Sequence, residues 1–222
     1  MSARALTLTE TVFLLDVDNT LLDNDAVIAD LRLHLVEAFG PECDRRYWEI
    51  FEQLRTELGY ADYLGALQRY RIEHPHETQA VKISLFLLHY PFAGRVYPGA
   101  FDAIDALQGR GRTAILSDGD VVFQPRKIER SGLWAAVEGE VLIYIHKEQM
   151  LDDVARRYPA RRYVMVDDKL RILAAMKRVW GDRLTTVFVR QGHYASDPSV
   201  LAEYPEADVS VGTIGEVVDL RI

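Results

Sequence analysis

Two carboxylates, Asp16 and Asp18, follow directly on a short apolar run at residues 12–15. A run of this kind is typical of a buried strand. Carboxylates this close repel each other, and desolvation raises the free-energy cost of ionising both. Their spacing therefore indicates either a cation that neutralises them or two different roles in one reaction.

Three further strand-like runs also end in reactive side chains. One ends at Ser117 and Asp118, one is followed by Lys147, and one is followed by Asp167 and Asp168. Ligands of open α/β sheets bind at the carboxyl ends of the strands, so we expect these groups to converge. Carboxylate oxygens suit Mg²⁺, which also binds phosphate oxygens. The set predicts a metal-dependent enzyme that acts on phosphate.

These residue types can divide the work of phosphoryl transfer. A carboxylate such as Asp16 can attack phosphorus and form an aspartyl phosphate. Asp18 can protonate the leaving oxygen and later activate water. Ser117 and nearby backbone N–H groups can hold phosphoryl oxygens, and Lys147 can neutralise charge on the nucleophile and the phosphate. Asp118 lies near these groups and is included with Ser117 and Lys147 among the candidate phosphate-binding residues, although local turn chemistry is its simplest interpretation.

The elements that must position these groups alternate between strand and helix. The pattern predicts an α/β fold, a Rossmann-like, doubly wound parallel sheet, interrupted after its first strand by an all-helical insert. The insert shows apolar residues only at helical spacing, with helices expected around 28–39, 48–58, 60–72 and 77–88. The strands are expected at 12–15, 113–116, 141–145, 163–166, 186–189 and 208–211, and the remaining helices at 101–107, 121–130, 147–157 and 169–180.

Composition excludes some classes of function. The chain has 222 residues and a formal net charge of −8, which disfavours a nucleic-acid binder and an anionic membrane surface as partners. No run is long and apolar enough to span a bilayer, and no signal peptide is evident, so we expect a cytoplasmic protein. Cys43 is the single cysteine and lies between Glu42 and Asp44, which disfavour a reactive thiolate.

The ordered motifs resemble those of the haloacid dehalogenase (HAD) superfamily, in the branch with a helical cap inserted after the first strand. The segment Asp16-Val17-Asp18-Asn19-Thr20 is similar to that family's first motif, Asp-x-Asp-x-Thr. Ser117, Lys147 and the pair Asp167-Asp168 are similar to the second, third and fourth motifs. The resemblance implies core segments at 1–22 and 92–222 and a cap at 23–91.

The resemblance also implies roles for single residues. It makes Asp16 the nucleophile and Asp18 the general acid and base, with Mg²⁺ held by Asp16, the backbone carbonyl of Asp18, and Asp167 or Asp168. Dehalogenases of the family lack an acid two residues after the nucleophile, so the chain resembles the phosphatases and phosphotransferases instead.

Two departures from the family pattern concern the third and fourth motifs. Glu148 stands where a proline often follows the third-motif lysine, and Ile172 stands where a further acid often follows the fourth motif. Asp167 and Asp168 must then supply the whole metal contribution of their strand, with Asp168 the direct ligand by alignment.

The sequence thus predicts a Mg²⁺-dependent phosphatase that hydrolyses a small phosphomonoester through an aspartyl-phosphate intermediate. Two alternatives stay open, a phosphomutase on the same scaffold and a non-catalytic phosphometabolite-binding protein. The expected partner is a small phosphorylated metabolite, and the expected state is a monomer or a homodimer.

Overall fold

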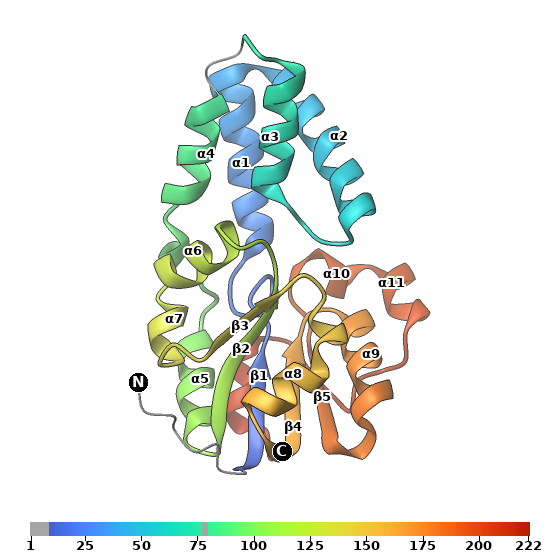
Figure 1. The fold of residues 1–222 in the computed structure, drawn as a ribbon. Helices are drawn as coiled ribbons and strands as arrows, with labels where there is room; N and C mark the ends of the chain where they lie inside the picture. The colour runs from blue at the N-terminus through green and yellow to red at the C-terminus, as the bar shows by residue number, and fades with distance from the viewer. Residues whose placement is uncertain (1–8, 77–79) are drawn as a thin grey trace.

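The computed structural model describes residues 9–76 and 80–222. Its centre is a six-stranded sheet in the order β3-β2-β1-β4-β5-β6, with every neighbouring pair parallel (Figure 1). The strands are β1 (Thr9–Leu15), β2 (Arg112–Asp118), β3 (Val141–Tyr144), β4 (Ala160–Asp167), β5 (Leu184–Val189) and β6 (Val209–Val211). The predicted parallel, doubly wound sheet is confirmed.

The strand order reverses between β1 and β4, the two central strands. Leu15 at the end of β1 is in register with Ile115 of β2 on one side and Val166 of β4 on the other. The connections from β1 run outward to β2 and β3, and those from β4 run outward to β5 and β6. This reversal opens a crevice at the carboxyl ends of β1 and β4, where open α/β sheets bind ligands.

Alternating side chains of the sheet pack into two cores. In β1, Phe13 and Leu15 belong to one core, while Val12 and Leu14 belong to the other. The first core also contains apolar residues of α5 (Ala100–Gln108), α6 (Phe123–Arg130), α7 (Leu133–Ala136) and η4 (Ile214–Asp219). The second contains residues of α8 (Leu151–Arg157) and α9 (Leu170–Trp180). Both faces of the sheet are thereby covered, as parallel sheets require.

Four helices lie beyond the carboxyl ends of the strands (Figure 1). They are α1 (Asn24–Phe39), α2 (Pro41–Leu58), α3 (Tyr63–Glu73) and α4 (Ala80–His89), and the chain returns to the sheet through η1 (Phe92–Arg95). Pro41 begins α2 and a left-handed Gly59 ends it, as the positions of these residues predict. The start of the helix expected at 77–88 lies outside the described residues. The division into a core at 1–22 and 92–222 and a cap at 23–91 stays a prediction.

The main departure from the expected elements lies after β3. The helix expected at 147–157 is split into a single 3₁₀ turn, η2 (Lys147–Gln149), and α8. The Lys147 backbone N–H donates to Asp118 Oδ1 at 2.7 Å, which fixes the turn beside the end of β2. Six short elements were not predicted, because helices of one or two turns carry little periodicity: η1, α7, η3 (Gly181–Arg183), α10 (Gly192–Ser196), α11 (Pro198–Glu203) and η4.

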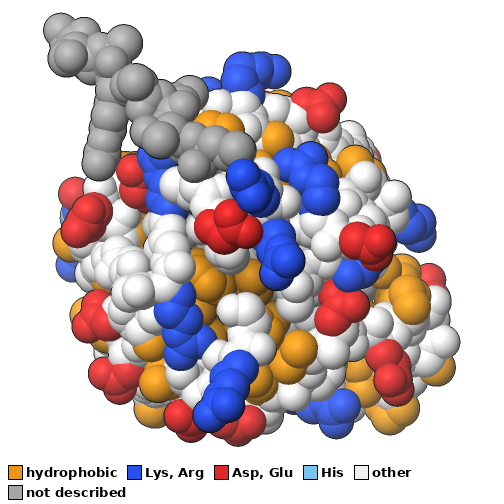
Figure 2. All heavy atoms as spheres, turned by 90° about the horizontal axis from the view of Figure 1, so that it is seen from below, with side chains coloured by type: hydrophobic (Ala, Val, Ile, Leu, Met, Phe, Trp, Pro, Cys, Tyr) orange, Lys and Arg blue, Asp and Glu red, His pale blue; other side chains and the backbone are white. Residues whose placement is uncertain are grey.

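The surface carries mixed charges at the end of the core away from α1–α4. Lysine and arginine side chains alternate there with aspartate and glutamate and do not form a patch of one sign (Figure 2). Over the described part of the chain, no helix combines the length and the hydropathy needed to cross a bilayer.

Candidate active site

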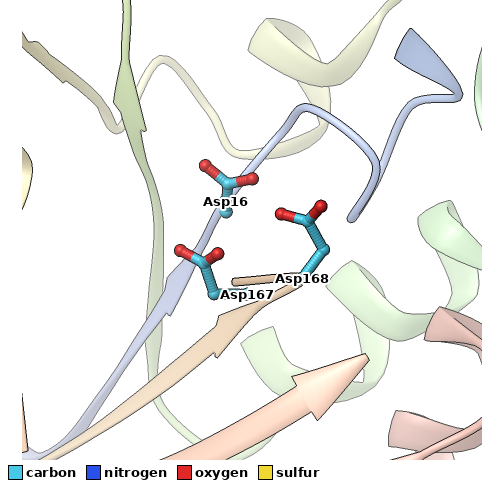
Figure 3. Close-up of side chains that lie close together, drawn as sticks. All are labelled: Asp16, Asp167 and Asp168. Carbon is cyan, nitrogen blue, oxygen red and sulfur yellow. The ribbon is translucent and has the colours of Figure 1, made fainter. Parts of the chain in front are cut away.

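Three carboxylates meet at the crevice between β1 and β4. Asp16 follows β1, and Asp167 and Asp168 lie at the end of β4, with one ligand oxygen of each within 4.8 Å of the others (Figure 3). All three residues are buried, the most exposed being Asp16 at 3%. The sequence predicted this convergence. Buried acids at such distances need a cation, because burial and mutual repulsion both oppose ionisation.

Lys147 supplies part of the positive charge. Its Nζ lies 2.5 Å from Asp16 Oδ1 and 2.7 Å from Asp167 Oδ2. Burial alone would lower the pKa of Lys147, but the carboxylates of Asp16, Asp167 and Asp118 outweigh it and raise the pKa above its usual value. The ammonium group therefore stays charged beside Asp16, whose other oxygen accepts a hydrogen bond from the Thr20 hydroxyl at 3.2 Å.

Asp168 is the least compensated member of the cluster. Neither of its carboxylate oxygens accepts a hydrogen bond from any described residue, and its nearest ammonium, Lys169 Nζ, lies 4.0 Å away. Burial raises the pKa of Asp168 well above its usual value and raises that of Asp167 to about 6. Orphaned buried oxygens of this kind are the donors that a hard cation prefers. The donor set fits a divalent ion such as Mg²⁺.

Asp18 lies apart from this cluster and faces a different cation. Its side chain is 23% exposed, and its Oδ1 accepts a hydrogen bond from Lys127 Nζ at 2.7 Å. The loop that follows β1 turns sharply, with Asn19 at φ 60° and its N–H donating to Leu22 O. Asp16 and Asp18, two positions apart in the sequence, have different partners, Lys147 for Asp16 and Lys127 for Asp18.

Ser117 and Asp118 end β2 beside the cluster. The Ser117 hydroxyl is buried and accepts a hydrogen bond from the Gln124 side-chain amide at 2.9 Å. The Asp118 carboxylate accepts the Lys147 N–H, and burial raises the pKa of Asp118 even though the Lys147 ammonium opposes the shift. Asp118 therefore orders the Lys147 turn. Its predicted role in phosphate binding remains a prediction.

A cavity of about 730 Å³ lies between the carboxyl ends of the strands and helices α1–α3. Asp18, Asp118 and Lys169 line it from the sheet side, and Trp48 and Arg55 line it from the helical side. The Arg55 guanidinium also donates to the Tyr194 hydroxyl at 3.0 Å, so α2 and α10 touch across the cavity. The site thus has a chamber that accommodates a small molecule next to Asp18.

Two cationic residues at the site were not among the predicted site residues. Lys169 directly follows the two acids of β4, which was a local signal for it. Lys127 is fully buried on α6, and it shares the buried face of that helix with Phe123 and Gln124. Its spacing of four from Phe123 was the available signal, but a lysine in a short helix is usually solvated.

The chain is similar to a known protein family and to several solved structures. Residues 11–179 match the family model described as hydrolase: haloacid dehalogenase-like hydrolase. A crystal structure assigned to the haloacid dehalogenase-like hydrolases, from Burkholderia xenovorans LB400, is similar with a TM-score of 0.94 and 67% identity, covering 96% of this chain and 100% of that chain. No curated protein matches the chain.

More distant structures share the fold alone. Magnesium-bound YfnB of Bacillus subtilis has a TM-score of 0.62 at 18% identity, with coverage of 96% of this chain and 98% of that chain. L-2-haloacid dehalogenase of Xanthobacter autotrophicus has a TM-score of 0.63 at 17% identity, with the same two coverages. The fold therefore accommodates both metal-bound and dehalogenase members.

Proposed function

The chain belongs to the haloacid dehalogenase-like hydrolases, and within that family we propose that it is a Mg²⁺-dependent phosphatase acting on a small phosphomonoester. The observation that carries this proposal is Asp18, an acid two residues after Asp16 that lines the cavity beside the cluster. A carbon–halogen bond needs no proton on its leaving group, whereas an alkoxide leaving group does. An acid at this position therefore favours phosphate ester chemistry over dehalogenation.

The proposed reaction has two steps. An oxygen of Asp16 attacks phosphorus and forms an aspartyl phosphate, while the ester oxygen leaves and takes a proton from Asp18. Water then attacks the phosphorus of the aspartyl phosphate and gives its proton to Asp18. The bond between phosphorus and Asp16 breaks and inorganic phosphate departs, which leaves Asp16 as a carboxylate and Asp18 again as the protonated acid.

The remaining residues position charge in this scheme. Lys147 neutralises Asp16 as the phosphate dianion approaches, and Ser117 is proposed to bind a phosphoryl oxygen once its hydroxyl turns from its current partners. Asp16, Asp168, Asp167 and the Asp18 backbone carbonyl would hold Mg²⁺. The bound ion would let these acids stay ionised together and would withdraw charge from the phosphoryl oxygens. The orphaned Asp168 oxygens support this assignment.

The test is hydrolysis of 4-nitrophenyl phosphate with Mg²⁺ and with EDTA, by the wild type and by Asp16→Asn. Asp16→Asn keeps the shape of the side chain and removes the attacking carboxylate, so turnover should vanish. Asp182→Asn is the matched control, because Asp182 is exposed in η3. Turnover that survives in Asp16→Asn, or that is the same in EDTA, would rule out the mechanism.

Two further assays separate the competing activities. Halide release from a 2-haloacid without phosphate release would indicate a dehalogenase. Transfer of the phosphoryl group to an added sugar phosphate, with little inorganic phosphate, would indicate the phosphomutase alternative. Binding of phosphorylated compounds without turnover of any of them would indicate the non-catalytic alternative.

A further inference from the structure

Lys127 is an ammonium group with no access to water. It lies on α6, its exposed fraction is 0%, and it is outside the Asp16 cluster. A buried ammonium is strongly destabilising unless it is paired and hydrogen-bonded. A methionine of similar length could fill this position without the free-energy cost of removing a charge from water, so the buried ammonium of Lys127 calls for a functional explanation.

Both polar partners of Lys127 lie on the segment that links β1 to the helical insert. Its Nζ donates to Asp18 Oδ1 at 2.7 Å and to Asn24 Oδ1 at 2.9 Å. The rings of Phe123 and Tyr63 enclose the ammonium at 5.1 and 5.8 Å from their centroids. Asp18 is the one carboxylate that is ion-paired with Lys127 among the described residues.

Asn24 extends this contact into the helical layer. It is the first residue of α1, and its side-chain amide donates to the Tyr63 hydroxyl at 3.2 Å. Tyr63 is the first residue of α3 and lies beside Phe123 of α6, with the ring centroids 5.2 Å apart. A continuous chain of contacts thus runs from Asp18 through Lys127 to the starts of two helices that cover the cavity.

We propose that Lys127 is a positioning residue for Asp18: it holds the Asp18 carboxylate in the lining of the cavity and links it to the first residues of α1 and α3. This inference rests on the proposed function, in which Asp18 protonates the leaving oxygen. Asp18 directly precedes the turn at Asn19 and its side chain is partly exposed, so without an anchor its carboxylate would sample several rotamers. In the first step, formation of the aspartyl phosphate, a misplaced acid lowers the rate most for substrates whose leaving group needs the proton.

The test compares two aryl phosphates of similar size, 4-nitrophenyl phosphate and phenyl phosphate. Phenolate is the poorer leaving group and depends more on general acid catalysis. Lys127→Met should lower kcat/KM, which reports the steps through formation of the aspartyl phosphate, by about 10- to 100-fold more for phenyl phosphate than for 4-nitrophenyl phosphate, within the range that general acids contribute. Lys127→Arg should recover part of the phenyl phosphate rate. Lys177→Met, on α9 and paired with Asp208, is the matched control and should leave the ratio of the two rates unchanged.

A double variant asks whether Lys127 acts through Asp18. If it does, Lys127→Met should add little to the leaving-group dependence already present in Asp18→Asn, so the two effects are non-additive. Equal losses of kcat/KM on both substrates, or additive effects in the double variant, would overturn the proposal and assign Lys127 a purely structural role.

Crystal structures give a readout that does not depend on turnover. In Lys127→Met we expect the Asp18 carboxylate to leave its present position or to occupy several conformers, while Asp16, Asp167 and Asp168 stay in place. An Asp18 side chain that is unmoved in that variant would overturn the positioning role. Failure of the wild type to hydrolyse either aryl phosphate would instead count against the proposed function, and the crystallographic result would still decide the role of Lys127.

Discussion

Removal of the Asp168 charge should stabilise the metal-free protein and should remove most of the stabilisation that Mg²⁺ gives. Three buried carboxylates, Asp16, Asp167 and Asp168, lie beside the buried ammonium of Lys147 and the partly exposed ammonium of Lys169. Asp168→Asn removes one of the three negative charges. In the metal-free protein the variant should therefore be more stable than the wild type, although it loses a functional residue.

The magnitude follows from the distances. One carboxylate oxygen of Asp168 lies within 4.8 Å of one oxygen each of Asp16 and Asp167. Each of these two like-charge pairs costs about 3.5 kcal/mol at an effective dielectric constant of about 20. Two such pairs give about 7 kcal/mol, and attraction to Lys169 at 4.0 Å offsets about 4 kcal/mol of it. Lys147 offsets part of the remainder. We expect a net gain of about 1–3 kcal/mol, or about 2–10 °C in Tm for a chain of this size.

The gain should depend on pH in a defined direction. A carboxyl group whose pKa is raised by folding stabilises the fold at low pH and loses that contribution as the pH rises through the raised pKa. Burial raises the pKa of Asp168 well above its usual value. The advantage of Asp168→Asn should thus be present at pH 8 and should shrink toward pH 5.

The assay is thermal unfolding at pH 8 in EDTA and in saturating Mg²⁺. At a free Mg²⁺ concentration of 100 times Kd, the wild type should gain about 2.7 kcal/mol, whereas Asp168→Asn should gain little. Asp182→Asn should follow the wild type in both conditions. A variant that is less stable than the wild type in EDTA would refute the repulsion argument, and a full Mg²⁺ response in the variant would refute Asp168 as a ligand.

Three further predictions follow from the same contacts. Because burial raises the pKa of Asp167 to about 6, the affinity for Mg²⁺ should fall as the pH is lowered through 6, by up to about tenfold per pH unit for each displaced proton. Calorimetry in buffers of different ionisation enthalpy would measure the proton release. A Kd for Mg²⁺ that does not change with pH would contradict this prediction. Lys147→Met leaves Asp16 and Asp167 without their buried partner. It should lower the free energy of unfolding in EDTA by about 3–5 kcal/mol, as measured by urea denaturation. An unchanged denaturation midpoint would show that the ion pairs of Lys147 do not contribute to stability. Gly59→Ala places a Cβ 2.6 Å from His146 Cε1 at a φ of +77°, and the left-handed backbone alone should destabilise the protein by about 1–2 kcal/mol. His146→Ala should relieve only the close contact between the new Cβ and the His146 ring. Full recovery of stability in the double variant would therefore contradict the backbone contribution.

The sequence by itself determined the fold class and the central cluster. Strand patterns with period two and helix patterns near 3.6 are local properties, so they could be read without the structure. The acids at 16, 167 and 168 and the lysine at 147 follow predicted strands, and the carboxyl ends of parallel strands meet at one edge of a sheet. Their convergence therefore followed from topology alone.

Only the tertiary structure decided what surrounds each of these groups. Asp16 and Asp18 form one motif in the sequence, yet in the structure Asp16 is paired with Lys147 and Asp18 with Lys127. The sequence separation between Asp18 and Lys127 is 109 residues, and no local pattern encodes a contact of that range.

The same reason applies to the burial of charge. Whether a lysine such as Lys127 is solvated or enclosed depends on which helices pack over it, and the rings of Phe123 and Tyr63 that enclose it come from α6 and α3. Periodicity identifies the face of a helix that is buried, but it does not identify the side chains that face it across a cavity. The reactive groups were therefore evident from the sequence, whereas their pairing, desolvation and protonation depended on packing between distant segments.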